Sequence, residues 1–219
     1  MQTVRPHEEE AMTNDRFGFH QNLPENIRDI FMWLCQDVAM LRLKWNFYIG
    51  LYSSKESTEL MSDLASTSFK IIEESLRRDM TMAICRLSDP IKTMGQENLS
   101  FRTLFDRLDD DQSRLEMLEE FLQACKPVQA LRNKRVGHSD LHTRIKPQNN
   151  PLPGIRRSQI EHIIKQAEMI LNYVYQRYVD SQLSFRPVHP GGADALIYWL
   201  RKGWDSEINE RKVVVKVAV

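Results

Sequence analysis

The sequence predicts an all-α protein, an up-down helical bundle that ends in a short C-terminal helix and a strand-like tail. Apolar residues recur at helical spacing over most of the chain, and breaks rich in Pro, Ser and Asn divide these stretches. The one β-prone run lies at the C-terminus and has no second strand in the sequence to pair with. We divide the chain into a mobile N-terminal arm (1–22), the helical bundle (23–186) and the C-terminal helix with its tail (187–219).

Two long helices open the bundle. Pro24 suits a helix start, and the apolar stripe that follows it continues to about Tyr52. SSKEST marks a second start, and the stripe from Leu60 to Leu87 stops at Ser88-Asp89-Pro90. Each helix has roughly thirty residues and a length of about 45 Å, so the two are expected to pair antiparallel across their short connection.

The middle of the chain contains shorter elements. After a loop, Ser100 is expected to cap a short helix through Leu108. Asp109–Asp111 could hold a divalent metal, but no second acidic group accompanies them at a recognisable spacing, so helix capping is favoured. Pro127 is expected to kink the next helix. The predicted apolar stripe of that helix comprises Leu115, Leu118, Leu122, Cys125 and Val128.

Another long amphipathic helix and a short one complete the chain. The long helix follows a loop rich in Pro and Asn (146–154) and reaches from about Ile160 to Tyr178. After a break at Pro187–Gly192, a short helix is expected over Asp194–Lys202. The β-branched run VVVKVAV at the C-terminus, residues 213–219, is expected to be a strand.

Aromatic residues occur near both ends of the bundle. Trp33 and Trp45 share the apolar pattern of the first helix and are interpreted as core or dimer contacts. Tyr198, Trp199 and Trp204 lie beside two cationic residues and could stack on nucleic-acid bases. A short aromatic helix more often covers one end of a bundle, so packing is the favoured interpretation of these three.

Composition excludes several classes of function. The 219 residues contain 30 Lys and Arg and 30 Asp and Glu, so the formal net charge is zero. A protein that coats bulk nucleic acid is disfavoured, because counterion release needs a cationic surplus over the whole footprint. Gly191-Gly192 is the sole adjacent pair among 8 glycines, which leaves no Walker or Rossmann phosphate loop, and no cofactor is expected.

Cysteine usage and hydropathy indicate a cytoplasmic protein with no membrane segment. Cys35, Cys85 and Cys125 are far apart and lie within apolar helical pattern, which is typical of buried thiols in a reducing compartment. None has a histidine nearby in sequence, so a nucleophilic cysteine is unsupported. The first residues lack an apolar leader, and no uncharged apolar run approaches the roughly 20 residues of a membrane span.

The segment 126–146 is basic. Six cationic side chains face one acidic side chain, a local charge of plus five. Compensating carboxylates gather in the stretch 106–120. Charge segregated in this way can form a local anion site on a neutral protein. The seven charged residues are Lys126, Arg132, Lys134, Arg135, Arg144, Lys146 and Asp140.

The motif inside this segment resembles the HEPN superfamily. Its signature is an Arg, usually followed by a polar residue, and a His after four to six further positions near the end of a bundle helix. Arg132-Asn133 and His138 fit it, with five residues between Arg132 and His138. RLSDP (86–90) and ADALIYWLRKG near the C-terminus are similar to the abortive-infection branch of the superfamily. The resemblance covers about residues 25–203.

The resemblance implies a homodimer in which two such motifs form one composite site that cleaves RNA without a metal. Arg132 and His138 are the implied catalytic residues, since an Arg fork binds phosphate oxygens and imidazole exchanges protons near neutral pH. Asn133, Lys134 and Arg135 are implied to contact RNA or nucleotide. An antitoxin or defence-system protein is the implied partner. The alternative is a non-catalytic helical module that binds nucleotide or a partner protein.

Geometry adds an expectation of its own. In an unbroken helix six residues rotate by about 600°, which leaves Arg132 and His138 about 120° apart and about 9 Å along the axis. The helix is therefore expected to loosen at Gly137 and swing His138 back. The simpler alternative is that Arg132 and His138 both cap a helix C-terminus. His138 and His142 lack a third ligand at recognisable spacing, so no metal site is expected.

Overall fold

The computed structural model describes residues 22–109, 112–136, 154–186 and 191–217. The predicted all-α fold class is confirmed, because helices make up most of the described chain. Residues 1–21 of the predicted arm lie outside the described residues, as do Asp110 and Asp111 of the predicted cap. The helices are α1 (Glu25–Tyr52), α2 (Lys55–Leu87), α3 (Phe101–Asp106), α4 (Gln112–Leu131), the π-helix η1 (Arg132–Val136), α6 (Arg157–Gln176) and α7 (Ala193–Val217).

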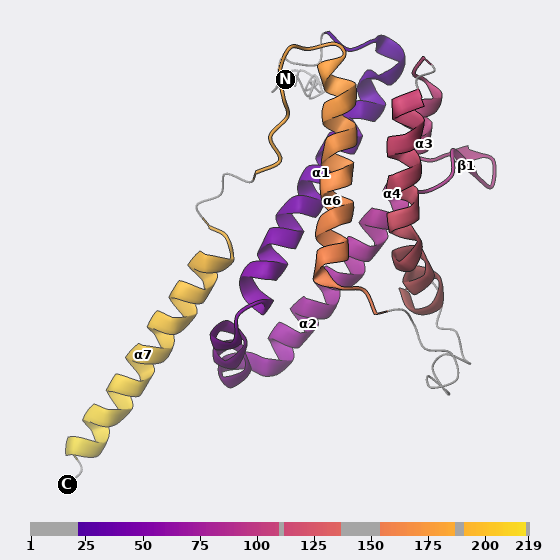
Figure 1. Ribbon diagram of the computed structural model, residues 1–219. Coiled ribbons are helices and arrows are strands. Elements are labelled where there is room, and N and C mark those ends of the chain that lie inside the picture. The colour runs from indigo at the N-terminus through magenta and orange to yellow at the C-terminus, as the bar shows by residue number, and fades with distance from the viewer. Residues whose placement is uncertain (1–21, 110–111, 137–153, 187–190, 218–219) are drawn as a thin grey trace, which may run out of the picture.

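Helices α1 and α2 pair antiparallel, as their lengths and short connection predict (Figure 1). Three side-chain contacts fix their alignment. From one contact to the next, the residue number increases on α1 and decreases on α2, as antiparallel helices require. They are Lys44 to Asp79, Tyr48 to Glu73, and Tyr52 to the carbonyl of Phe69. Antiparallel pairing follows because the two-residue connection leaves no room for a crossover.

Helix α2 is interrupted near its start. Ser54 caps it by accepting a hydrogen bond from the Ser57 amide. At Ala65 the backbone leaves helical geometry, with φ −160° and ψ 62°. Three Ser and Thr residues follow directly, and their side chains compete with the helical backbone for hydrogen bonds. The first turns of α2 can therefore lie at an angle to the remainder of the helix.

Two short elements connect α2 to α4. The strands β1 (Lys92–Thr93) and β2 (Gln96–Glu97) pair antiparallel within the predicted loop, around Met94 and Gly95, both of which have positive φ. Ser100 caps α3 by accepting from the Thr103 amide, as the sequence predicts.

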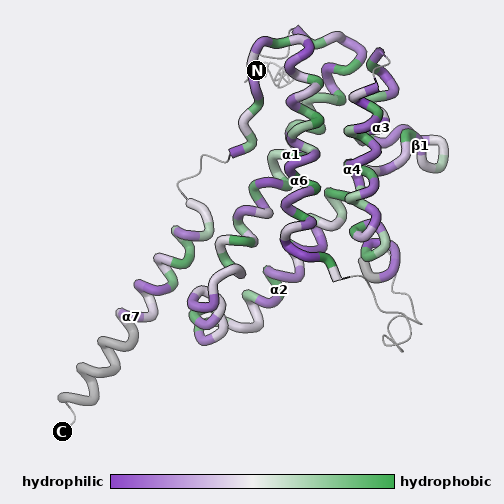
Figure 2. The backbone as a smooth tube through the Cα atoms, in the orientation of Figure 1, coloured by the Kyte–Doolittle hydropathy of each residue, from purple (hydrophilic) through white to green (hydrophobic). Residues whose placement is uncertain are grey.

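One hydrophobic core joins α1, α2, α3, α4 and α6. Hydrophobic and hydrophilic residues succeed one another in short blocks along these helices, the pattern of helices buried on one face (Figure 2). The largest fully buried side chains of this core include Phe31, Phe101, Phe121, Leu34, Leu41 and Ile84. Trp45 lies in this core, whereas Trp33 is 53% exposed and contributes nothing to it.

Two of the predicted stripes are only partly buried. Leu115 is 48% exposed, and Phe121 takes a fully buried place on α4 instead. Leu115 lies in the first turn of α4, at the rim of an open cleft that it lines with Pro90 and Arg102. On α2, burial is continuous only near the C-terminal end, and Ile72 in the middle remains exposed.

The prediction of a C-terminal strand is wrong. Helix α7 begins at Ala193, where a short helix was expected, and continues to Val217 without interruption. Strand propensity reflects packing on a pleated surface more than a backbone preference, so it does not outweigh a helix already propagating through residues 193–212. The first turns of α7 contact the bundle, and the remainder of its backbone projects away from it (Figure 1).

A second, smaller cluster attaches α7 to the bundle. Ala193 packs with Leu51 of α1 and Met61 of α2. Gly50 permits this approach, because a Cβ at that position would lie 2.5 Å from the Ala193 Cβ. None of the helices in the described ranges combines the length and apolarity of a membrane span.

Candidate functional site

Arg132, within the basic segment, lies where α4 becomes a π-helix. The α-helical backbone of α4 ends at Leu131, and η1 occupies Arg132–Val136, the five residues that immediately precede Gly137. A π turn widens the helix and rotates the residues that follow it, and such turns are frequent at functional sites. The helix geometry therefore changes at the arginine of the motif.

Some of the predicted site residues lie within the described part of the chain, and one lies outside it. Arg132 is the first residue of η1, and its side chain is 29% exposed. Asn133 is exposed and Lys134 is half-buried. Arg135 is part of the π-helical backbone. His138 lies outside the described residues, together with the predicted hinge at Gly137.

Arg132 packs against the C-terminal end of α2. Its Nη2 lies 3.8 Å from Oδ1 of Asp89, which immediately follows Ser88 at the end of that helix. The guanidinium also approaches the Cys85 thiol. Its Nε is buried and has no hydrogen-bond partner among the described residues. The contact thus joins the RLSDP segment to the start of the motif, two stretches more than forty residues apart.

The two helix ends are also hydrogen-bonded to each other. Gln129 Nε2 donates to Ser88 Oγ at 2.8 Å. The Ser88 hydroxyl in turn lies 3.1 Å and 3.0 Å from the carbonyl oxygens of Ile84 and Cys85, to which it can donate. Ser88 is 2% exposed, so this contact is shielded from water. It fixes the end of α2 against α4 one turn before Arg132.

Burial determines the titration of the groups beside Arg132. Burial raises the pKa of Asp89 above its ordinary value of 3.8, and the charges of Arg132 and Arg86 offset only part of that rise. Burial also raises the pKa of the Cys85 thiol to about 11, although Arg132 acts in the opposite direction. The pKa of Cys35 and of Cys125 rises to about 12, again through burial. All three cysteines are free, and such thiols are poor nucleophiles at neutral pH.

The acidic stretch lies at the opposite end of α4 from η1. Described carboxylates there include Asp106, Glu116 and Glu119, and basic residues follow toward the C-terminal end of the helix. Acidic side chains near the N-terminus of α4 and basic side chains near its C-terminus also complement the helix dipole. Arg114 lies in the same acidic stretch and is only 2% exposed. Its Nη1 donates to the Leu108 carbonyl at 2.7 Å.

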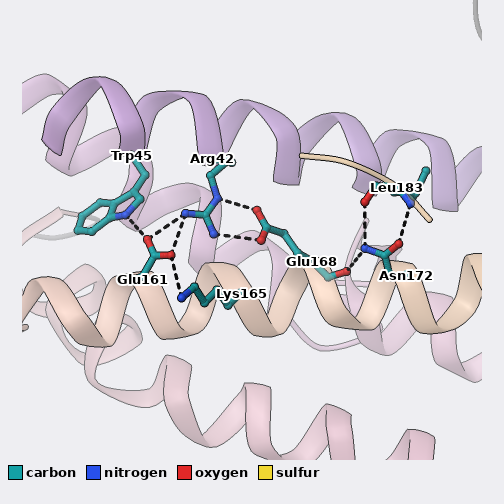
Figure 3. A network of polar contacts seen from close by, with 7 residues as sticks. All are labelled: Arg42, Trp45, Glu161, Lys165, Glu168, Asn172 and Leu183. Carbon is teal, nitrogen blue, oxygen red and sulfur yellow. Dashed lines mark hydrogen bonds and ion pairs between the residues drawn. The ribbon is translucent and has the colours of Figure 1, made fainter. Parts of the chain in front are cut away.

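A second polar cluster was not anticipated by sequence reasoning. Arg42 of α1 is 9% exposed and binds two carboxylates of α6 (Figure 3). Its Nε and Nη2 donate to Glu168 at 2.6 Å and 3.0 Å, and its Nη1 donates to Glu161. Glu161 also accepts from the Trp45 indole. The sequence feature that could have predicted this cluster is an arginine directly after Leu41, which belongs to the apolar stripe of the first helix.

This cluster borders an open cleft of about 400 Å³. Burial alone would raise the pKa of Glu161, but hydrogen bonds from Arg42 and Trp45 and the charges of Arg42 and Lys165 lower it overall. Lys165, Asn172 and Arg186 line the cleft as well. Because Arg42 already compensates both carboxylates, we interpret the cluster as a connection between helices.

The aromatic residues of α7 do not cover the bundle as expected. Tyr198 is 58% exposed and Trp199 is 62% exposed, while Trp204 is half-buried. Lys202 Nζ lies 5.0 Å above the Trp199 ring. Contact with the bundle comes from the opposite side of α7, where Leu196, Ile197 and Leu200 pack on the second cluster. The prediction that these aromatic residues pack over one end of the bundle is therefore wrong for Tyr198 and Trp199.

The described residues contain no group of three His, Cys, Asp or Glu side chains that could hold a metal ion. His138 and His142, at which no metal site was expected, lie outside them. The described part of the motif instead offers a partly exposed guanidinium at the edge of the core, with further basic residues after it in sequence. Such an arrangement can bind a phosphate oxygen without a metal.

Comparison with known protein families identifies a match over most of the chain. A family model described as HEPN_AbiU2, AbiU2, matches residues 24–195. No curated protein and no solved structure matches the chain. The matched range includes Asp89, Arg132 and His138, and it ends within the first turn of α7.

Proposed function

The chain belongs to the AbiU2 family of HEPN proteins, which is related to abortive infection, and on that premise we propose that it is a metal-independent endoribonuclease. Its site comprises Arg132 and His138 from two chains of a homodimer. It acts in the cytoplasm as part of a phage-defence or toxin system, with an antitoxin or another defence protein as partner.

The reaction that fits these residues is attack of an RNA 2′-hydroxyl on its own phosphate. This reaction needs a base for the hydroxyl, an acid for the leaving oxygen and a cation for the crowded phosphate. Arg132 provides the cation through its planar donors. One His138 cannot be base and acid in the same step, so the second comes from the other chain across the twofold axis.

The observation that carries the proposal is the state of Arg132. It stands at the junction of α4 and η1, held against the end of α2, with 29% of its side chain exposed. An arginine used only for packing would be enclosed, and one used only for solvation would not approach Asp89 and Cys85. Exposed Asn133, with Lys134 and Arg135, contacts flanking phosphates or bases.

The proposal is tested with purified full-length protein and RNA in EDTA. Arg132→Ala and His138→Ala are expected to lower the cleavage rate at least about a hundredfold. Arg77→Ala is the matched control, because Arg77 is an exposed α2 arginine whose guanidinium lies 3.9 Å from Glu73. Thermal unfolding of each variant confirms folding. Wild-type cleavage that persists in both site variants would rule out this site.

One observation favours a second function, that of a non-catalytic module that binds nucleotide or a partner protein. Arg132 approaches Asp89, so part of its charge is already compensated within the chain. Under this alternative, RNA or nucleotide binds without cleavage, and Arg132→Ala weakens binding alone. A filter-binding measurement on the same variants separates the two functions.

A further inference from the structure

We propose that Asp89, at the end of α2, is a positioning residue that orients the Arg132 guanidinium toward the substrate phosphate. The inference rests on the proposed function for the role of Arg132, but the Asp89–Arg132 contact itself is described by the structure. Asp89 does not touch the substrate. It acts through Arg132.

The distance between the two groups suits positioning better than permanent pairing. Nη2 of Arg132 and Oδ1 of Asp89 are 3.8 Å apart, which is within an ion pair but beyond a hydrogen bond. A bidentate pair would occupy two of the five guanidinium donors. Here the carboxylate attracts one edge of the guanidinium and leaves donors available to a phosphate. A phosphate that binds Arg132 need not break a strong bond first.

Asp89 is itself fixed in place by its neighbours. Ser88 immediately before it is buried and accepts the 2.8 Å hydrogen bond from Gln129 of α4. Pro90 immediately after it restricts the backbone of Asp89. The carboxylate therefore has a defined place relative to α4, and through it so does Arg132. Two helices with different positions in the sequence thus determine where one side chain points.

The contact is a poor device for stability alone. Burial raises the pKa of Asp89 despite the charges of Arg132 and Arg86 that face it, so the ionised carboxylate is less favourable in the folded protein than in the unfolded chain. A purely structural ion pair would have the opposite effect. The Asp89→Asn substitution is therefore expected to leave the melting temperature unchanged or slightly raised.

The first measurement is steady-state RNA cleavage by Asp89→Asn in EDTA. A misplaced Arg132 is expected to lower kcat about tenfold to a hundredfold, with KM changed by less than about threefold. Asp89→Glu is expected to recover part of the loss, because it keeps the charge. Glu97→Gln is the matched control, because Glu97 is an exposed carboxylate that pairs with a different arginine, Arg107. Its kcat is expected to equal that of the wild type.

The second measurement does not depend on activity. The Arg132 Nε–H resonance, assigned by its loss in Arg132→Lys, is followed by NMR in arginine-labelled protein. It is expected to shift in Asp89→Asn and to stay unchanged in Glu97→Gln. An unchanged resonance in Asp89→Asn overturns the inference, whatever happens to kcat. If the wild type cleaves no RNA, the proposed function fails, and the resonance still decides whether Asp89 orients Arg132.

Discussion

Arg42 of α1 and Glu168 of α6 face each other with two parallel hydrogen bonds, 2.6 Å from Nε and 3.0 Å from Nη2 (Figure 3). The same guanidinium reaches Glu161 about two turns away along α6. One buried side chain therefore joins two helices at two points.

Removing Arg42 is expected to destabilise the fold. Arg42→Met leaves Glu161 and Glu168 without their main partner in partly buried positions, and we expect the unfolding free energy to fall by about 2 kcal/mol. Urea denaturation measures this change. Lys165→Met is the control, because that side chain is 65% exposed and its loss is expected to cost less than about 0.5 kcal/mol. Equal losses in both variants would contradict the special role of Arg42.

Acid is expected to weaken the same contact. The folded pKa of Glu161 lies below its ordinary value of 4.5, so its ionised form stabilises the fold above that value. This contribution is lost as pH falls below about 4.5 and through the lowered folded pKa. Over that range the melting temperature of the wild type is expected to fall more steeply than that of Glu161→Gln. Parallel curves would show that Glu161 does not titrate in this way.

The cysteines are expected to resist thiol reagents in the native protein. Their pKa values of about 11 to 12 leave almost no thiolate at pH 8, and none of the three is exposed. A chromogenic disulfide reagent is expected to react with no cysteine at first and with all three in urea. Rapid reaction of one thiol without denaturant would indicate that its helix opens locally.

The attachment of α7 is expected to depend on Gly50. In Gly50→Ala the new methyl group overlaps Ala193 Cβ, so the first turns of α7 must move away from α1. Hydrogen exchange of the α7 amides is expected to accelerate at least about tenfold. The control is Gly203→Ala on α7 itself, where a new Cβ would meet no atom within 4 Å apart from its chain neighbours and the surrounding helix backbone, and where alanine favours the helix. Unchanged exchange in Gly50→Ala would mean that α7 is held by other contacts.

Much of the fold could be predicted from the sequence, because apolar spacing determines which face of a helix is buried. The paired α1 and α2, the Ser100 cap and the stripe of α6 all follow from local patterns. The predictions were wrong where the local preference of a residue for a strand or for burial differs from what its position in the folded chain allows. The valines near the C-terminus favour a strand, yet they continue a helix, and Leu115 continues a stripe that the core does not reach.

The sequence by itself determined the motif, its basic surroundings and the family, since these depend on residue identity and order alone. Tertiary structure decided which groups surround Arg132. Asp89 and Ser88 come from a helix end more than forty residues away, and only the packing of α2 on α4 brings them to it. The Arg42 cluster likewise required two helices more than a hundred residues apart to pack together. Helical periodicity specifies which side of a helix is buried, but not which residue of another helix will meet it.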